Sequence, residues 1–332
     1  MLDIVVTHYQ EAWEIGKPFF DMLAIQKAVD FDSIHVMLIH DGTEPFPDEY
    51  FSNYPYEVEQ IRIEHGGVSA ARNAGIDRCT EKWVQFCDFD DLYTGVFSLK
   101  LLMDVLDTDR FDLLWGEFYS VDKKNDGGWA VHVRGENVVF VHGKVFRRKW
   151  LKRSGLRFDT DLEFNEDCLF CTTAMETIPT ERIGHIDAPF PFYTWCYTPK
   201  SATATQENWW RAYVGGYRRN IKCVELFKAK SPERYQAMVA RTVWDAYHAL
   251  NLENMPEGLK PCLEDFRGFW KEHKMDFWTT DPDSMAEVRD ISRKQYETGE
   301  SEALERWGNI PMQRRHGVKI KEWLEGIETG VF

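Results

Sequence analysis

The sequence has no apolar run that approaches the roughly 18 residues a membrane-spanning helix needs. A secretory signal peptide is also missing, because Asp3 interrupts the short apolar stretch at the N-terminus. Without either segment, we expect a cytoplasmic, soluble protein with no membrane span. The 332 residues, of which 43% are apolar, are enough for one large domain or two.

The seven cysteines form no recognisable disulfide or zinc pattern. Their number is odd, and the lack of a secretory signal favours reduced thiols. Cys168 and Cys171 have the CxxC spacing, but no second pair or nearby histidine completes a zinc site. We therefore interpret these two cysteines as one side of a buried helix.

Basic residues are fewer than acidic ones, 40 against 55, and the formal net charge is −15. This charge disfavours non-specific binding to DNA, RNA or an anionic membrane surface. The basic cluster between Lys144 and Arg153 is more typical of a solvated helix face than of a nucleic-acid patch. Aromatic residues are abundant instead, and 13 tryptophans suit stacking against sugar rings and bases as well as core packing.

Three carboxylates, Asp88, Asp90 and Asp91, follow the apolar run Trp83–Phe86, which predicts a buried strand. Acids at the carboxyl end of a strand lie where open α/β sheets bind ligands. Carboxylates this close repel one another, and a divalent cation with a preference for oxygen ligands relieves that repulsion. The segment therefore indicates a metal site that holds a diphosphate. The alternative is a solvated acidic turn, because aspartate is common in turns and helix caps.

Three further apolar runs, Leu2–Val6, Ile34–Ile39 and Val58–Ile63, each end in polar residues. Helical patterns separate most of the runs, and this alternation predicts a parallel sheet in an α/β fold. The ends of several strands would then meet at one edge and form one pocket.

The chain resembles the family 2 glycosyltransferases in five short segments that occur in the order of that family. These segments are Thr7-His8-Tyr9, His40-Asp41-Gly42-Thr43, Ala71-Arg72-Asn73-Ala74-Gly75, Phe86-Cys87-Asp88-Phe89-Asp90-Asp91 and Asn165-Glu166-Asp167. The resemblance covers roughly residues 1–200. Two positions depart from the family pattern, since His40 replaces an acid and Gln10 replaces an asparagine.

The resemblance implies an inverting enzyme with the GT-A nucleotide-sugar-binding fold, a Rossmann-like mixed sheet flanked by helices. We expect a GT-A catalytic domain over residues 1–205 and an α-helical C-terminal region over 206–332. In the second region apolar residues recur at helical spacing, and Pro256, Pro261 and Pro282 divide the run into separate helices.

Local patterns also predict elements in the second half of the catalytic domain. The runs Trp129–Val133 and Val138–Val141 suggest a β-hairpin. A helix is predicted over Gly143–Arg153 and another over Glu166–Glu176, with Asn165 as the N-cap of the latter.

The predicted cofactor is Mn²⁺ or Mg²⁺, held by the DXD motif Asp88-Phe89-Asp90 together with Asp91. Side chains two residues apart share a face of an extended segment, so Asp88 and Asp90 can point the same way. Which of the three acids binds the ion directly is open from the residues alone, and the resemblance favours Asp90.

The resemblance implies a nucleotide site built from Thr7, Tyr9, Asp41, Arg72 and Asp88. Tyr9 would stack on the base, and Asp41 would accept the imide N–H of uracil or thymine; the alternative for Asp41 is a turn residue. Arg72 would reach the base edge or the diphosphate, because its planar fork suits bidentate contacts. The alternative for Arg72 is an ion pair on a helix surface.

By resemblance, Asp167 is the general base that takes the proton of the acceptor hydroxyl, and Glu166 orients the acceptor or adjusts the pKa of Asp167. The alternative is simple capping, since acids are common in first helical turns. Trp195 and the loop Lys200–Thr203 would face the acceptor or the donor phosphates, and Trp115 would contact the donor sugar. A tryptophan packed at a domain junction is the alternative for Trp195.

The leading hypothesis is a metal-dependent inverting glycosyltransferase that uses a UDP- or dTDP-sugar, with the UDP-sugar favoured. The alternatives for the acceptor are a saccharide, a glycolipid, a protein and a modified nucleobase, and a homo-oligomer is left open. A nucleotidyltransferase shares the fold, but its glycine-rich loop after the first strand is missing at Thr7–Glu11. A non-catalytic nucleotide-sugar-binding or scaffold protein is the third alternative, and the full set of acids argues against it.

Overall fold

The computed structural model describes residues 1–106, 109–123, 127–135, 139–198, 205–310 and 312–332, with the backbone alone for 206–209. The chain divides into two compact units. Unit 1 consists of Met1–Asp161 and Glu166–Thr198, and unit 2 consists of Leu162–Asn165 and Pro199–Phe332. Each unit has its own core.

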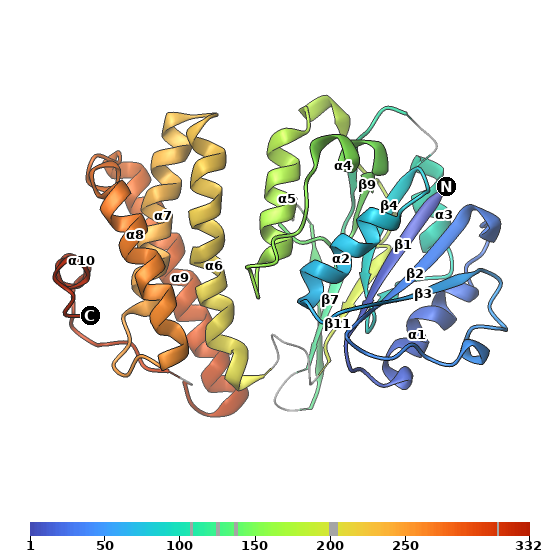
Figure 1. Ribbon diagram of the computed structural model, residues 1–332, viewed down its shortest axis with the longest axis horizontal. Coiled ribbons are helices and arrows are strands. Elements are labelled where there is room, and N and C mark those ends of the chain that lie inside the picture. The colour runs from blue at the N-terminus through green and yellow to red at the C-terminus, as the bar shows by residue number, and fades with distance from the viewer. Residues whose placement is uncertain (107–108, 124–126, 136–138, 199–204, 311) are drawn as a thin grey trace. The chain divides into compact units, whose positions relative to one another are not determined.

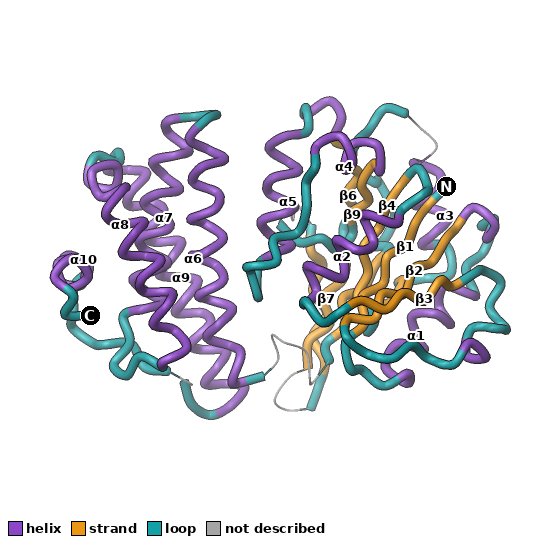
Figure 2. Tube along the Cα trace, in the orientation of Figure 1, coloured by secondary structure: helices purple, strands orange, loops and turns teal. Residues whose placement is uncertain are grey.

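A mixed sheet forms the centre of unit 1, and seven strands belong to it in the part of the chain that the structure describes (Figure 2). Its order is β10-β6-β9-β4-β1-β2-β3. The strands are β1 (Leu2–His8), β2 (Ile34–Asp41), β3 (Val58–Ile63), β4 (Trp83–Asp88), β6 (Leu113–Trp115), β9 (Lys144–Arg147) and β10 (Ile183–His185). β9 runs antiparallel to both of its neighbours, while the other pairings are parallel. The α/β fold that the sequence predicts is confirmed.

Helices cover both faces of this sheet (Figure 1). The helices α1 (Trp13–Ala24) and α3 (Ser98–Leu106) pack on one face. On the other face lie α2 (Gly67–Arg78), α4 (Arg148–Ser154) and α5 (Glu166–Thr177). The arrangement is a three-layer α/β/α structure in which the amino ends of α2 and α5 approach the carboxyl edge of the parallel strands.

Strand β1 supplies side chains to both cores, because successive residues of a strand point to opposite faces. Leu2, Ile4 and Val6 pack in the core that contains α1 and α3. Val5 packs in the other core with Ile76 of α2. Each of these aliphatic side chains is buried, which contributes about 1.5–3 kcal/mol apiece to folding. Burial on both sides therefore fixes β1 in the middle of the sheet.

Helix α2 lies very close to β1 at Gly75. A Cβ atom at this position would lie 2.4 Å from Val5 Cγ1, so a side chain cannot be accommodated without displacing the helix. Arg72 lies three residues earlier and therefore shares a face of α2 with Gly75. The close packing thus allows the Arg72 side chain to reach the end of β4.

A second sheet of unit 1 has the order β5-β11-β7-β8 in the described residues. Its strands are β5 (Leu92–Tyr93), β7 (Phe118–Lys123), β8 (Trp129–Arg134) and β11 (Tyr193–Cys196). β7 pairs antiparallel with β8 and parallel with β11. Short 3₁₀ turns elsewhere in the chain span Phe31–Ser33, Asp48–Tyr50, Thr180–Arg182 and Glu257–Leu259.

Two local predictions are wrong. Trp129–Arg134 pairs with Phe118–Lys123, so the hairpin involves the preceding strand and not Val139–Val141; residue 138 lies outside the described residues. The predicted helix Gly143–Arg153 begins as strand β9 and becomes α4 only at Arg148. Val145 and Phe146 are fully buried between β4 and β6, and this burial on both faces outweighs the local helical pattern.

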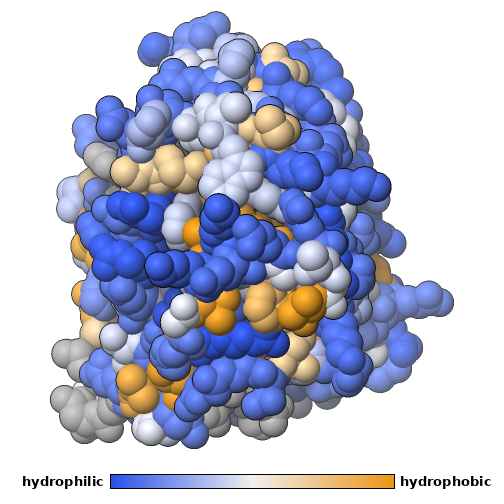
Figure 3. All heavy atoms as spheres, turned by 90° about the vertical axis from the view of Figure 1, so that its left-hand side faces the viewer, coloured by the Kyte–Doolittle hydropathy of each residue, from blue (hydrophilic) through white to orange (hydrophobic). Residues whose placement is uncertain are grey.

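Unit 2 is helical in its described residues, as the sequence predicts. It contains α6 (Gln206–Lys228), α7 (Pro232–Leu250), α8 (Lys260–Trp278), α9 (Pro282–Trp307) and α10 (Ile320–Thr329). Large side chains from several of these helices share one core, among them Trp210, Tyr217, Val243, Phe266, Trp270 and Trp323. Figure 3 shows a face of the molecule on which hydrophilic residues predominate and apolar residues form only small groups.

Prolines lie in the first turns of α7, α8 and α9. Pro261 and Pro282 lie in the first turns of α8 and α9, where a missing N–H costs no helical hydrogen bond. The Ser231 side chain accepts from Arg234 N at the start of α7, and the Asp281 side chain accepts from Ser284 N at the start of α9. Among the described residues, none of the helices combines the length and the apolar composition needed to cross a bilayer.

Candidate active site

The carboxyl ends of β1, β2 and β4 meet at one edge of the large sheet. Thr7 lies opposite Asp88 in the β1–β4 ladder, and His8 lies opposite His40 in the β1–β2 ladder. Thr7 Oγ1 donates to Asp88 Oδ1 over 3.3 Å. Segments that are distant in the sequence therefore converge at the edge where parallel sheets bind ligands.

Arg72 joins two of the predicted acids. Its side chain is 4% exposed, its Nη1 contacts Glu166 Oε1 at 2.8 Å, and its Nη2 contacts Asp88 Oδ1 at 2.9 Å. Its Nε has no hydrogen-bond partner among the described residues. The guanidinium thus connects the end of β4 to the first residue of α5, and both of its terminal nitrogens are engaged by carboxylates.

The two partners of Arg72 respond differently to burial. Burial alone would raise the pKa of Asp88, but the charge of Arg72 and the contact with His142 hold it well below its usual range. Burial and the neighbouring Asp167 raise the pKa of Glu166, and Arg72 offsets only part of this rise. The pKa of Asp88 is thus lowered and that of Glu166 raised, although both carboxyl groups contact the same guanidinium.

Asp91 is a buried residue that anchors β11. Its Oδ2 accepts from the Tyr193 hydroxyl at 2.7 Å, and its Oδ1 accepts from Cys196 N at 2.9 Å. Burial and the charges of Asp88 and Asp90 raise its pKa well above the usual value. The fold therefore gives Asp91 a structural partner for each oxygen.

Asp90 lies between these two acids in the sequence but is half-buried. Burial raises its pKa to about 6, a hydrogen bond with Thr198 opposes this rise, and the charges of Asp88 and Glu11 add to it. Glu11, which accepts from Tyr9 N at 2.7 Å, was missed in the sequence analysis. The raised pKa indicates that this corner of the site lacks a compensating positive charge.

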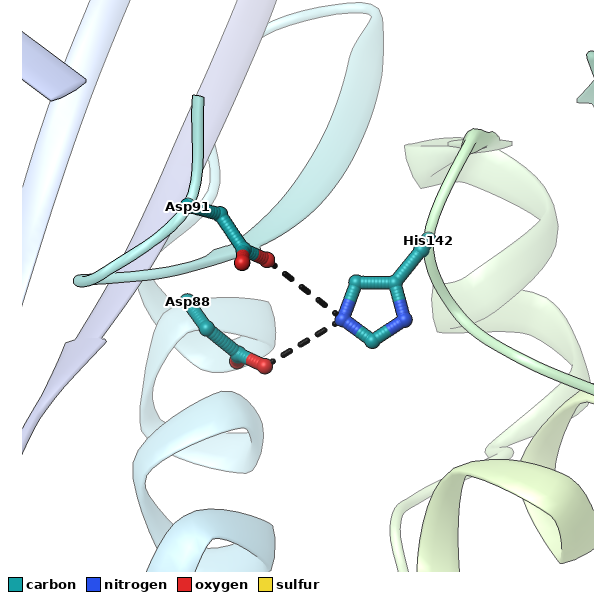
Figure 4. A group of neighbouring side chains, drawn as sticks. All are labelled: Asp88, Asp91 and His142. Atoms are coloured by element: carbon teal, nitrogen blue, oxygen red, sulfur yellow. Dashed lines mark hydrogen bonds and ion pairs between the residues drawn. The ribbon is translucent and has the colours of Figure 1, made fainter. Parts of the chain in front are cut away.

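His142 is the clearest site residue that the sequence analysis missed. Figure 4 shows its ring on a loop facing Asp88 and Asp91, with Nε2 3.3 Å from Asp88 Oδ2 and 3.5 Å from Asp91 Oδ2. The loop reaches this edge because β9, which follows it, runs antiparallel to β4. Two carboxylates and an imidazole converge here, and such a group can either hold a divalent cation or be joined by hydrogen bonding from the imidazole.

Asp41 fixes the loop that leads into α2. Its Oδ1 accepts from Gly66 N at 2.7 Å, and its Oδ2 accepts from Gly67 N and His65 Nδ1, both at 2.9 Å. The side chain is buried, so these contacts take up most of its hydrogen-bonding capacity. His65 in turn stacks on Tyr9 with ring centroids 4.6 Å apart, and Tyr9 is 43% exposed. The predicted nucleotide residues therefore lie close together.

Asp167 lies in the first turn of α5. Its Oδ1 accepts from Cys168 N at 2.7 Å, and its Oδ2 accepts weakly from Val141 N at 3.4 Å. Asn165 precedes the helix with a φ of +65° and donates its side-chain amide to Ala212 O. Asp167 thus lies at the amino end of α5, with one oxygen facing Cys168 and the other facing Val141.

The two predicted tryptophans have different surroundings. The ring centroid of Trp195 lies 6.0 Å from that of His142, so Trp195 lies beside the residues that contact Asp88 and Asp91. The ring centroids of Trp115 and His185 lie 4.3 Å apart, and Trp115 lies opposite Lys144 in the β6–β9 ladder. The predicted loop Lys200–Thr203 lies outside the described residues.

The two histidines at the strand ends form a buried pair. His8 Nδ1 lies 2.9 Å from His40 Nδ1, and His40 Nε2 lies 3.0 Å from Gln60 Oε1. Burial lowers the pKa of both rings, and that of His40 falls from 6.5 to about 4. At neutral pH, therefore, His40 is uncharged in the folded protein.

This pair makes stability depend on pH. Between pH 6.5 and 4 the unfolded chain takes up a proton at His40 that the folded protein cannot, so the free energy of unfolding falls as pH falls. His40→Gln removes the titration and is expected to flatten this decline. Melting temperatures from pH 7 to pH 4.5 measure this pH dependence of stability. The control is His316→Gln, at an exposed histidine. Parallel curves for His40→Gln and wild type would contradict the assignment.

Comparisons with known proteins agree with this architecture. The sequence model of glycosyl transferase family 2 matches residues 3–175, just over half of the chain. The uncharacterized glycosyltransferase EpsJ of Bacillus subtilis (strain 168) is 25% identical over 182 residues, which cover 48% of this chain and 52% of EpsJ. The minor teichoic acid biosynthesis protein GgaA of the same organism is 30% identical over 181 residues, covering 49% of this chain and 40% of GgaA. The chain thus spans about half the length of these relatives or less.

Solved structures with the same fold include S. aureus TarS 1–349. In complex with UDP-GlcNAc it has a TM-score of 0.52 and 16% sequence identity, covering 89% of this chain and 92% of that chain. Its complex with UDP has a TM-score of 0.50 and 17% identity, covering 89% of this chain and 91% of that chain. At these identities the similarity establishes the fold. On the family match, the strand order and the converging acids, this chain belongs to glycosyl transferase family 2, a family of glycosyltransferase enzymes with the GT-A fold.

Proposed function

We propose that this protein is a metal-dependent inverting glycosyltransferase that moves a sugar from a UDP-sugar to an acceptor hydroxyl. The observation that carries the proposal is the Arg72 bridge, which joins Asp88 at the end of β4 to Glu166 beside Asp167. Donor-binding acids and a candidate base thus belong to one network within unit 1.

The donor end of the site fits a divalent cation. Asp90 is half-buried with a raised pKa, and Asp88 lies two residues earlier at the end of β4. We assign Asp90 and Asp88 as ligands, with Asp91 holding the loop in place. When bound, the cation would stabilise the charge that develops on the departing diphosphate as a Lewis acid.

The nucleotide end of the site is the group of residues around Tyr9. Tyr9 offers an exposed ring for base stacking, and His65 is its neighbour. The side chains of Asp41, Thr7 and Arg72 already bond to other groups of the protein, so their proposed role is to hold the nucleotide site in shape. The TarS complexes with UDP and UDP-GlcNAc support a UDP-sugar as the donor.

The acceptor end of the site is the start of α5. We assign Asp167 as the base that takes the proton of the acceptor hydroxyl while that oxygen attacks the anomeric carbon opposite the leaving group. Trp195 could stack on a sugar ring of the acceptor. A saccharide or glycolipid acceptor fits such an aromatic platform best. For Trp115, the last residue of β6, we propose no contact with the donor sugar.

A donor screen tests this function. The protein is incubated with a panel of nucleotide sugars and Mn²⁺, and the release of free nucleoside diphosphate is measured. We expect release from a UDP-sugar, its loss in EDTA, and its recovery on addition of excess Mn²⁺. Asp90→Asn should release little, and Asp283→Asn, on an exposed residue of unit 2, should resemble wild type.

The alternatives give different results in the same screen. A nucleotidyltransferase would release pyrophosphate from a nucleoside triphosphate, and a binding or scaffold protein would release nothing. Release that is unaffected by EDTA would contradict the metal dependence while leaving the transfer reaction in place.

A further inference from the structure

We propose that the turn Val141–Lys144 is a positioning element that holds the donor acids and the catalytic base in a fixed relation, with His142 as its positioning residue. The proposal rests on the proposed function, because it concerns the same site. It assigns to His142 the role of a hydrogen-bond donor to Asp88 that also lies 3.5 Å from Asp91, and not that of a metal ligand.

The turn itself is rigidly defined. Lys144 N donates to Val141 O at 3.3 Å, which closes a four-residue turn, and Gly116 N donates to Gly143 O at 2.9 Å. Gly143 has a φ of +69°, and a Cβ atom there would lie 2.6 Å from Gly116 O. Glycine is therefore required at this position for two separate reasons, its backbone conformation and its close approach to Gly116, the residue after β6.

The His142 ring is held by packing on several sides. Its side chain is 8% exposed, and the rings of Phe118, Tyr193 and Trp195 lie 5.5, 5.7 and 6.0 Å away. Its Nδ1 has no hydrogen-bond partner among the described residues, so its one polar interaction is made through Nε2. The ring orientation is thus set by aromatic contacts, and Nε2 is aimed at the two carboxylates (Figure 4).

Nε2 completes the set of partners around Asp88. Asp88 Oδ1 accepts hydrogen bonds from Arg72 and Thr7, and Asp88 Oδ2 accepts one from His142. Because a carboxylate accepts only, the hydrogen of this contact belongs to Nε2. With a donor on each oxygen the plane of Asp88 is fixed, and Asp91 is held on the same side.

The residue before His142 in the turn contacts the proposed base, Asp167. Val141 N donates to Asp167 Oδ2, while the adjacent His142 contacts Asp88 and Asp91. Two neighbouring residues therefore touch the donor acids and the base. A displacement of this turn would change both groups together, which is what separates it from an ordinary structural loop.

Two substitutions separate positioning from ligation and from packing. His142→Phe fills the same volume without a donor, and His142→Gln places an amide N–H near the position of Nε2. Loss of a group that orients metal-binding carboxylates typically costs about 10–100-fold in metal affinity or activity. We expect His142→Phe to lose about that much in Mn²⁺-dependent UDP affinity and to lower kcat for transfer. His142→Gln should recover most of both losses.

The measurements are calorimetric titration of UDP with Mn²⁺, steady-state kcat and KM, and melting temperature, with His316→Phe as the matched control at an exposed histidine. Equal losses in His142→Gln and His142→Phe would indicate a metal ligand and would overturn the positioning role. The double variant His142→Phe/Asp91→Asn gives a further test. If its loss of affinity, as a free energy, equals the sum of the two single losses, the positioning role would also be overturned, because the effects of residues that act through one another are not additive.

A crystal structure of His142→Phe gives a readout that does not depend on activity. The Asp88 and Asp91 carboxylates are expected to move apart when the shared donor is lost, and unchanged positions would contradict the proposal. If wild type releases nucleoside diphosphate from no sugar donor, the proposed function fails, while this structural comparison still decides the role of His142.

Discussion

Replacing Asp167 with asparagine is expected to lower kcat for sugar transfer by about 10²–10⁴-fold, the range that general-base catalysis usually contributes. The amide has nearly the same shape as the carboxylate but cannot accept the proton of the acceptor hydroxyl. Asp167 lies in the first turn of α5 and accepts from Cys168 N, which presents the carboxylate at a fixed position. The loss should therefore appear in the chemical step.

Binding measurements show whether the effect is chemical. Asp167→Asn should bind UDP and Mn²⁺ nearly as wild type does, because the Arg72, Asp88 and His142 contacts do not use this side chain. Glu181→Gln, at an exposed acid, serves as the control. If Asp167→Asn kept near-normal turnover, Asp167 would not be the base.

The second large effect is on stability. Arg72→Leu is expected to lower the free energy of unfolding of unit 1 by about 3–5 kcal/mol, the usual result of removing one member of a buried ion pair. The substitution leaves Asp88 and the buried Glu166 without their shared cation. Loss of Arg72 also raises the pKa of Asp88, so part of the stability that its ionised form supplies above pH 4 disappears.

Chemical denaturation followed by circular dichroism measures this loss. Arg78→Leu removes an exposed arginine from the last turn of the same helix and should cost no more than about 1 kcal/mol. Adding Glu166→Gln to Arg72→Leu should restore part of the stability, because it removes one of the two unpaired acids. A double variant no more stable than Arg72→Leu alone would show that the ion pair with Glu166 is not the cause.

The strands of the catalytic unit were readable from the sequence because their signal is local. β1 to β4 are short runs of β-branched and aromatic residues that end in polar segments, and each run appears in the structure. The acids that follow β4 lie at the predicted edge of the sheet. Strand β9 was misread because it has four residues whose buried neighbours are supplied by β4 and β6, distant in the chain.

The partners of the site residues were less predictable than the residues themselves. Arg72 was expected to reach the nucleotide, yet its terminal nitrogens contact Asp88 and Glu166, the latter 94 positions away. Such a contact depends on how α2 and α5 pack on the sheet. His142 gave no signal at all, since an isolated histidine acquires its role only from the direction in which β9 runs.

Gly75 illustrates how a residue without a side chain can protect chemistry that it does not perform. Any larger residue there would collide with Val5 and push α2 outward, so Arg72 would no longer reach its carboxylates. A side chain at position 75 therefore requires a smaller one at position 5. The need for the ion pair thus extends to a position that touches neither of the charged groups.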